Sequence, residues 1–143
     1  KLIQLIEEVK PDAVVMLGLA AGRFKITPER IAINVHDGAK DNNGVAYADQ
    51  TIVEGGLDGY FSTLPIRKMI DTLIDNGFPA EVSNSAGTYV CNHIMYTALH
   101  YGKVPAGFIH IPASHELAII HGNIPSWSQH DLNEAIKICI HCL

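Results

Sequence analysis

Apolar residues follow two patterns along this chain. Short, mostly apolar runs predict strands at residues 13–17, 30–35, 80–83 and 107–111. The first of these runs is continuously apolar, so we expect that strand to be buried on both faces. Apolar residues spaced three and four positions apart predict helices over residues 1–9, 65–76, 92–101 and 128–143. Helices that alternate with strands predict an α/β fold with a parallel sheet.

Two long stretches are predicted to be loops. Residues 36–59 are polar and rich in Asp, Asn and Gly, and residues 112–127 form the second stretch. Long loops in a compact domain are usually functional. Ligands of parallel sheets bind beyond the carboxyl ends of the strands, which lie near the loop from Gly18, the turn before Cys91 and the segment after His110.

Composition narrows the class of protein. The chain has 143 residues, 48% of them hydrophobic, and a net charge of −5, which suits one domain spanning residues 1–143. The acidic balance argues against sequence-independent binding of nucleic acid, and no apolar run is long enough to predict a membrane span. Three cysteines make a disulfide framework unlikely, so we expect a reducing cytoplasm.

Cys91 has the setting of an activated nucleophile. A turn rich in small residues, Ser83–Val90, precedes it, and the helical pattern follows it. The positive end of a helix dipole favours the thiolate, and the thiolate is the form that attacks a carbonyl carbon.

A cysteine nucleophile needs a base, and the chain has eight histidines. His93 is close in sequence, but two residues further along a helix its ring points round the helix from Cys91. His110 is the better candidate, because it is a polar residue within the apolar run 108–112. A lone histidine on a strand is more often a core or edge residue, so both interpretations of His110 stay open.

Three other features have simpler interpretations. Glu29 could orient the base, but its position favours a solvated carboxylate at a strand edge or a partner of Arg30. Cys139 and Cys142 form a CxxC pair that could bind a metal or act in redox chemistry, yet Cys139 fits the apolar face of the last helix and two further zinc ligands are not evident. The glycine-rich loop 18–22 lacks a phosphate-binding motif and suits close approach to a small ligand.

These residues also resemble those of a known family. The segments Gly18–Asn34 and Ser83–His93 resemble two signatures of the pyrrolidone-carboxylate peptidases (pyroglutamyl peptidase type I), which remove N-terminal pyroglutamate from peptides. Two shorter segments, Tyr60–Pro65 and Phe108–Pro112, also match, and the similarity covers nearly the whole chain in order.

The resemblance implies roles for individual residues. Cys91 takes the place of the nucleophile, His110 of the general base and Glu29 of the residue that orients it. Leu19, Tyr89 and Val90 match positions that bind substrate. The resemblance further implies a three-layer α/β/α sandwich with a mostly parallel open sheet, catalysis through a thioester without a metal or other cofactor, a homodimer or homotetramer, and a cytoplasmic location.

The chain also departs from the family pattern. Members usually open with a strand and a loop that helps to enclose the pyroglutamyl ring, and both are absent here, which together with the uncapped start of the first helix suggests a missing upstream segment. Leu19 stands where many members carry Gln, and residues 36–42 differ from the usual sequence. A truncated or inactive relative that keeps the fold and oligomer contacts without turnover is therefore the alternative.

Overall fold

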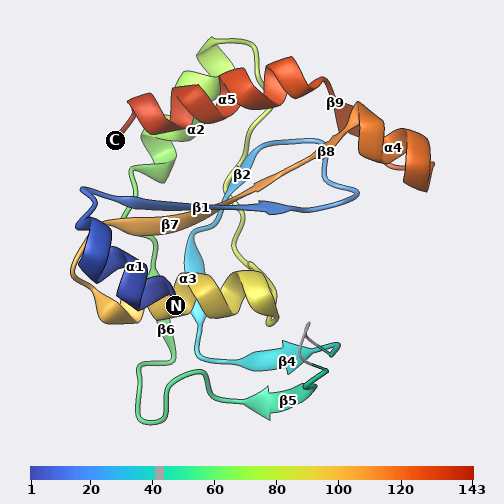
Figure 1. The fold of residues 1–143 in the computed structure, drawn as a ribbon. Helices are drawn as coiled ribbons and strands as arrows, with labels where there is room; N and C mark the ends of the chain where they lie inside the picture. Colours follow the sequence, from blue (N-terminus) through green and yellow to red (C-terminus); the bar gives the residue numbers. More distant parts are fainter. Residues whose placement is uncertain (41–43) are drawn as a thin grey trace. The chain divides into compact units, whose positions relative to one another are not determined.

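The computed structural model describes residues 1–40 and 44–143 (Figure 1). The contacts of these residues divide the chain into two compact units. Unit 1 contains residues 1–16, 29–64 and 84–108, and unit 2 contains residues 17–28, 65–83 and 109–143. The helices are α1 Leu2–Val9, α2 Ile66–Asp75, α3 Val90–Tyr101, α4 His115–His121 and α5 Gln129–His141. The strands are β1 Val14–Leu19, β2 Thr27–Pro28, β3 Ile31–Ile33, β4 His36–Gly38, β5 Tyr47–Gln50, β6 Gly59–Phe61, β7 Ala106–Ile111, β8 Ala113–Ser114 and β9 Ser126–Trp127.

The three-stranded sheet has the strand order β1-β7-β2. Its strands β1 and β7 each contain residues of both units. In unit 2, β2 is antiparallel to β7, with Thr27 opposite His110. Ile26 donates to the Pro79 carbonyl (3.0 Å) and Glu81 donates to the Ile26 carbonyl (3.1 Å), so Ala80 forms an isolated parallel bridge with Ile26. The strand predicted at 80–83 is therefore reduced to isolated bridges at Ala80 and Ser83 and does not form a continuous strand.

Strand β1 is less buried than its sequence predicts. Leu17 is 47% exposed and Leu19 is 49% exposed, although a continuous apolar run is typical of a strand covered on both faces. Among the described residues β1 is the outermost strand of its sheet, which explains the exposure.

Unit 1 is built around α3. This helix packs on α1 and on the antiparallel pair β3–β6, in which Ala32 lies opposite Tyr60. The α3 residues Met95 and Tyr96 are fully buried against Ala32, which accounts for the apolar spacing in the sequence. The residues 30–35, predicted as a strand, thus pair with β6 rather than within the three-stranded sheet.

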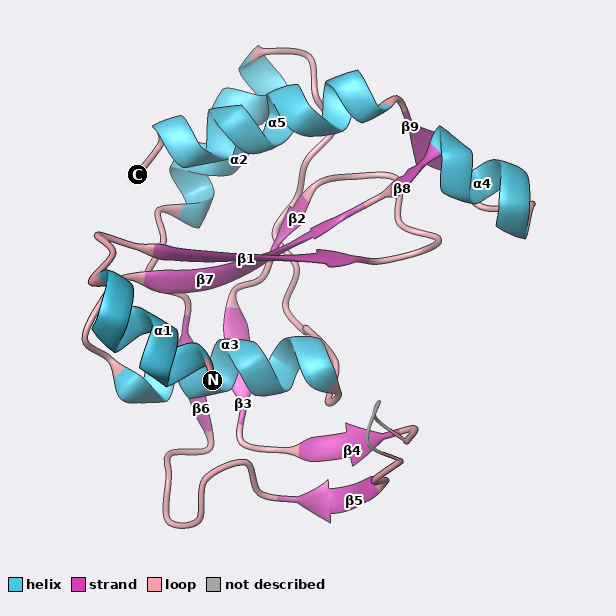
Figure 2. Cartoon of the chain, in the orientation of Figure 1, coloured by secondary structure: helices cyan, strands magenta, loops and turns pink. Residues whose placement is uncertain are grey.

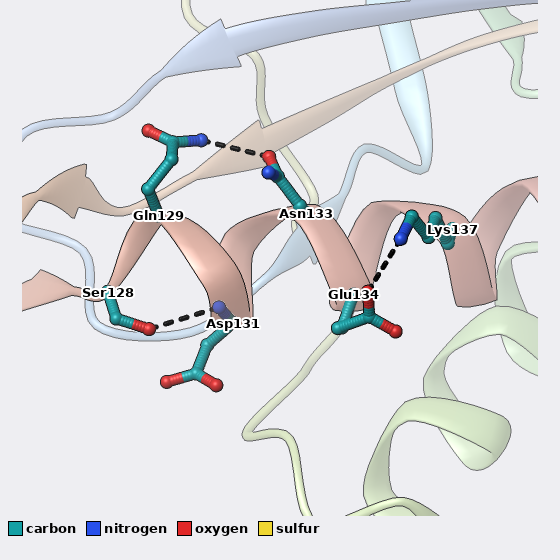
Figure 3. Close-up of polar contacts among 6 residues, drawn as sticks. All are labelled: Ser128, Gln129, Asp131, Asn133, Glu134 and Lys137. Carbon is teal, nitrogen blue, oxygen red and sulfur yellow. Dashed lines mark hydrogen bonds and ion pairs between the residues drawn. The ribbon is translucent and has the colours of Figure 1, made fainter.

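Unit 2 is held together by α2 and α5, which pack side by side (Figure 2). Their buried residues lie at helical spacing, as the sequence predicts: Met69, Ile70, Leu73, Leu132, Ala135 and Cys139. Ser128 caps α5 as predicted, because its hydroxyl accepts a hydrogen bond of 3.0 Å from the Asp131 N–H (Figure 3).

Both predicted loops contain regular structure. In unit 1, β4 and β5 form an antiparallel pair with a register shift, and in unit 2 the segment 112–127 contains β8, α4 and β9. These elements carry little apolar periodicity: β5 is mostly exposed, and α4 buries no residue. The part of the first predicted loop at 41–43 lies outside the described residues.

Among the described residues, no helix combines the length and apolar character that a membrane crossing requires.

Replacing Asn92 tests the link between α3 and the strands of unit 1. Its buried amide accepts from the Ile33 N–H and donates to the carbonyls of Ile33 and Val35, each at 2.9 Å. Asn92→Ala leaves these backbone groups buried without that partner, so we expect the free energy of unfolding to fall by about 2–4 kcal/mol in urea titrations. Asn133→Ala, which removes an exposed amide pair on α5 (Figure 3), should change it by less than about 0.5 kcal/mol. Equal losses would contradict this account.

Candidate active site

Cys91 is the second residue of α3 and is half-buried. The helix begins after Tyr89, whose backbone is extended, and Gly87 in the preceding turn has φ +78°, a conformation that favours glycine. No side chain caps this end of the helix. The N–H groups of a first turn lack intrahelical acceptors and carry the positive end of the dipole. The geometry predicted for Cys91, at a helix start after a small-residue turn, is confirmed.

Hydrogen bonds connect the segment around Cys91 to residues 33–40 of unit 1, both before and after Cys91. Before Cys91, the Asp37 N–H donates to the Thr88 carbonyl (2.8 Å), and the Thr88 hydroxyl donates to the Asp37 carbonyl (2.9 Å). The Tyr89 hydroxyl donates to the Lys40 carbonyl (2.9 Å). After Cys91, Asn92 makes the three hydrogen bonds described above. These contacts hold the first turn of α3 in a defined position.

His93 does bond elsewhere, as its position on the helix predicts. Its Nδ1 lies 3.0 Å from Nδ1 of His36, which is only 8% exposed. Burial, and secondarily the neighbouring His36, lower the pKa of His93 below its ordinary value. The His36 ring also stacks on Tyr47, with centroids 4.0 Å apart.

Glu29 is fully buried in unit 1, which overturns the solvated carboxylate that its position in the sequence favours. Its backbone N–H donates to the Phe108 carbonyl (2.8 Å), so the chain after β2 stays paired with β7. The other simple interpretation is that Glu29 pairs with Arg30. The Arg30 Nε, however, donates a hydrogen bond to the side-chain carbonyl of Asn84 at 2.7 Å. Carboxylates are rarely buried without a structural or functional reason.

His110 lies on β7 in unit 2 and is 6% exposed. It faces Thr27 across the pair, and the Thr27 hydroxyl accepts from Arg23 (2.7 Å) and lies 3.3 Å from the His110 carbonyl. The predicted site residues therefore divide between the units: Glu29, Tyr89, Val90 and Cys91 belong to unit 1, and Leu19 and His110 belong to unit 2.

The three residues predicted to bind substrate differ in exposure. Val90 is 48% exposed at the start of α3, and Leu19 is 49% exposed at the end of β1. Tyr89 is half-buried, and a Cβ added to Gly38 would lie 2.5 Å from its ring. This close approach requires glycine at position 38.

The CxxC pair at the end of α5 belongs to the core of unit 2. Cys139 is fully buried, and burial, with a smaller contribution from Cys142, raises its pKa to about 12. The Cys142 thiol lies 3.7 Å from the Thr72 hydroxyl. The buried Cys139 thiol, with its raised pKa, is a poor nucleophile, in agreement with the core interpretation. In the described part of the chain, no three His, Cys, Asp or Glu side chains gather into a group that could hold a metal ion.

The contacts of His36 with His93 and Tyr47 were not predicted from the sequence. His36 and His93 are 57 residues apart, and His36 and Tyr47 lie in a stretch predicted to be a loop. Only pairing across the β4–β5 hairpin and docking of β4 on α3 bring them together. No local pattern signals this arrangement.

Comparison with known proteins gives a consistent result. The sequence pattern of the pyroglutamyl peptidase family matches residues 1–143. A pyrrolidone-carboxylate peptidase from Oceanobacillus iheyensis is 56% identical, with 99% of this chain and 73% of that protein covered. The corresponding protein of Halalkalibacterium halodurans is 53% identical, with coverage of 97% and 72%.

Solved structures agree. A mutant pyrrolidone carboxyl peptidase from Pyrococcus furiosus superposes with a TM-score of 0.93 at 42% identity, covering 99% of this chain and 73% of that one. Pyroglutamyl peptidase I from Bacillus amyloliquefaciens gives a TM-score of 0.91 at 36% identity, covering 99% and 70%. These neighbours confirm the α/β fold class, and the chain belongs to the pyroglutamyl peptidase family of cysteine hydrolases.

Proposed function

We propose that this protein is a cysteine exopeptidase that hydrolyses the bond after an N-terminal pyroglutamyl residue. The observation that carries the proposal is the position of Cys91 in the first turn of α3, in a chain that is 56% identical to a pyrrolidone-carboxylate peptidase. Of the three cysteines, Cys139 and Cys142 are buried in the core, which leaves Cys91 as the accessible thiol.

In the proposed mechanism, the Cys91 thiolate attacks the pyroglutamyl carbonyl carbon and forms a carbon–sulfur bond. The N–H groups of the first turn of α3 stabilise the negative oxygen of the tetrahedral intermediate. His110 then donates a proton to the leaving amine, and the carbon–nitrogen bond breaks to leave a thioester. A water molecule, deprotonated by His110, hydrolyses the thioester and releases pyroglutamate and the thiolate.

Glu29 is proposed to orient His110. Two local observations support this role. Glu29 is fully buried, and its N–H bonds to Phe108, two residues before His110 on β7. Side chains along a strand point alternately to its two faces. Phe108 and His110, two residues apart on β7, therefore point to the same face, and so do Thr27 and Glu29 on the chain paired with β7.

The substrate pocket is proposed to use Leu19, Tyr89 and Val90. A pyroglutamyl ring is uncharged and compact, so apolar and aromatic walls with a few polar groups suit it. Tyr89 supports this assignment because its ring is held by contact with Gly38 and by the hydrogen bond to Lys40.

Self-association into a homodimer or homotetramer in the cytoplasm is also proposed. In unit 2, Ile119 is 83% exposed and Ile120 is 76% exposed on α4, a helix without buried residues. Association of a second copy over α4 would remove these two apolar side chains from water. Light scattering on Ile119→Asp, Ile120→Asp should give a lower molar mass than the unaltered protein, and an unchanged multimer would exclude α4 from the interface.

Substitution of the cysteines tests the nucleophile. Cys91→Ser should lower kcat/KM for a chromogenic pyroglutamyl amide on the order of a thousandfold or more, because serine lacks a comparably reactive anion. The matched control, Cys139→Ala with Cys142→Ala, should stay within about threefold of the unaltered enzyme. The reverse ranking would make the CxxC pair the reactive site. A folded but inactive unaltered chain would instead support the alternative of a relative without turnover.

Substitution of Gly38 tests the pocket. Gly38→Ala places a methyl group against the Tyr89 ring and displaces it, so we expect KM to rise on the order of tenfold with a smaller change in kcat. Tyr89→Phe keeps the ring and removes only the hydrogen bond to Lys40, so its KM should change by about threefold or less. If Gly38→Ala leaves KM unchanged, Tyr89 does not contact the substrate.

A further inference from the structure

A histidine pair, in which His36 is buried and His93 is half-buried, lies close in sequence to Cys91 in unit 1. Nδ1 of His36 on β4 and Nδ1 of His93 on α3 are 3.0 Å apart, so one nitrogen carries a hydrogen and the other accepts it. His36 is 8% exposed, and its Nε2 has no hydrogen-bond partner among the described residues. Neither feature takes part in the proposed mechanism.

The positions of the hydrogens follow from this geometry. In the neutral pair, the lower-energy arrangement has the His36 Nδ1–H donating to His93, because Nε2 of His36 is then a bare lone pair rather than a buried N–H without an acceptor. Adding one proton gives the pair three N–H groups. Since only one hydrogen fits between the two Nδ1 atoms, the third must lie on Nε2 of His36. Proton uptake therefore always creates a buried charge and a buried N–H that lacks an acceptor.

The pair lies next to the bonds that position Cys91. His93 follows Cys91 by two residues on the first turns of α3, and His36 precedes Asp37, which exchanges hydrogen bonds with Thr88. A change in the pair therefore acts on the segment that carries the nucleophile from its helical side.

We propose that His36 is a positioning residue: its hydrogen bond to His93 holds the first turn of α3, and uptake of a proton by the pair releases this turn and lowers the reactivity of Cys91 at acid pH. This inference rests on the peptidase activity proposed above, although its main test does not need turnover.

The surroundings set the direction of the pH effect. The titratable side chains that face His36 are His93, Tyr47 on β5 and Tyr89 before α3. Asp37 on β4, Asp49 on β5 and Cys91 on α3 are the other titratable residues within two positions of these groups along the chain. Burial and His36 lower the pKa of His93 from 6.5. The neutral pair is thus fully populated above pH 6.5. As the pH falls through the lowered pKa of His93 in the folded state, the pair takes up a proton that leaves an N–H on His36 Nε2 without an acceptor, and this cost favours release of the turn.

Two substitutions of His36 separate protonation from structure. In His36→Gln, the amide can donate to a neutral His93 or accept from a protonated one, so the contact survives in both states. In His36→Phe, the ring can still stack on Tyr47, but no hydrogen bond forms at any pH. The matched control is His100→Gln, at the other end of α3, where the histidine Nδ1 lies 3.0 Å from the Tyr60 hydroxyl.

The experiment measures the rate at which iodoacetamide alkylates Cys91 between pH 5 and 8, with the labelled peptide identified by mass spectrometry. At pH 7.5 we expect His36→Gln to match the unaltered protein within about twofold and His36→Phe to be roughly three- to tenfold slower. Each variant is compared with the unaltered protein at the same pH, and the thiolate fraction of Cys91 is measured in each variant by the thiolate absorbance at about 240 nm. The ratio of His36→Gln to the unaltered protein should rise by about threefold or more between pH 7.5 and 5.5, whereas the ratio for His100→Gln should stay flat.

Two results would overturn the proposal: a His36→Gln profile parallel to that of the unaltered protein, or a His36→Phe rate equal to it at pH 7.5. Turnover of a pyroglutamyl amide, measured in parallel, distinguishes the two proposals. If alkylation follows the expected pattern and no turnover is found, the peptidase function fails while the positioning role stands. If turnover is found and alkylation ignores His36, the positioning role fails alone.

Discussion

The side chain of Asn92 joins α3, the helix that carries Cys91, to the chain at Ile33 and Val35. One buried amide satisfies three backbone groups of Ile33 and Val35, which lie 59 and 57 residues earlier in the sequence. Because the residue is next to Cys91, the same bonds that support the core of unit 1 also determine where the thiol lies. The hydrogen bonds of Asn92 therefore contribute both to the stability of unit 1 and to the position of the Cys91 thiol. A change there acts on both, which is why enzymatic data on this segment need a parallel measurement of folding.

The helices were predictable because each has a strong apolar face. Met69 and Leu73 on α2, and Leu132 and Cys139 on α5, are buried as their spacing indicates. The hairpin β4–β5 and helix α4 were not predictable, because β5 is mostly exposed and α4 buries no residue, so neither has a strong apolar pattern. The prediction that both faces of β1 are buried was wrong. The sequence shows how hydrophobic a strand is, but it does not show whether the strand lies at the centre or at the edge of its sheet.

The candidate site divides along the same line. Cys91 was predictable from local signals, namely small residues followed by a helical pattern. Glu29 was not, because nothing adjacent to it reveals that its carboxyl group is fully buried; only pairing of the chain with β7 shows this. Its role came from the resemblance of long motifs, which record the outcome of tertiary structure without describing it. The histidine pair had neither signal, since it arises from a segment that departs from the family pattern.

The contact between Gly38 and Tyr89 also constrains how this sequence can evolve. Since a methyl carbon at position 38 would lie 2.5 Å from the aromatic ring, the two positions cannot enlarge independently. A lineage that replaces the glycine must first accept a smaller residue at 89, and a lineage that keeps the tyrosine must retain the glycine. The two sites should therefore covary among descendants of this gene, with the order of the two substitutions fixed by steric exclusion.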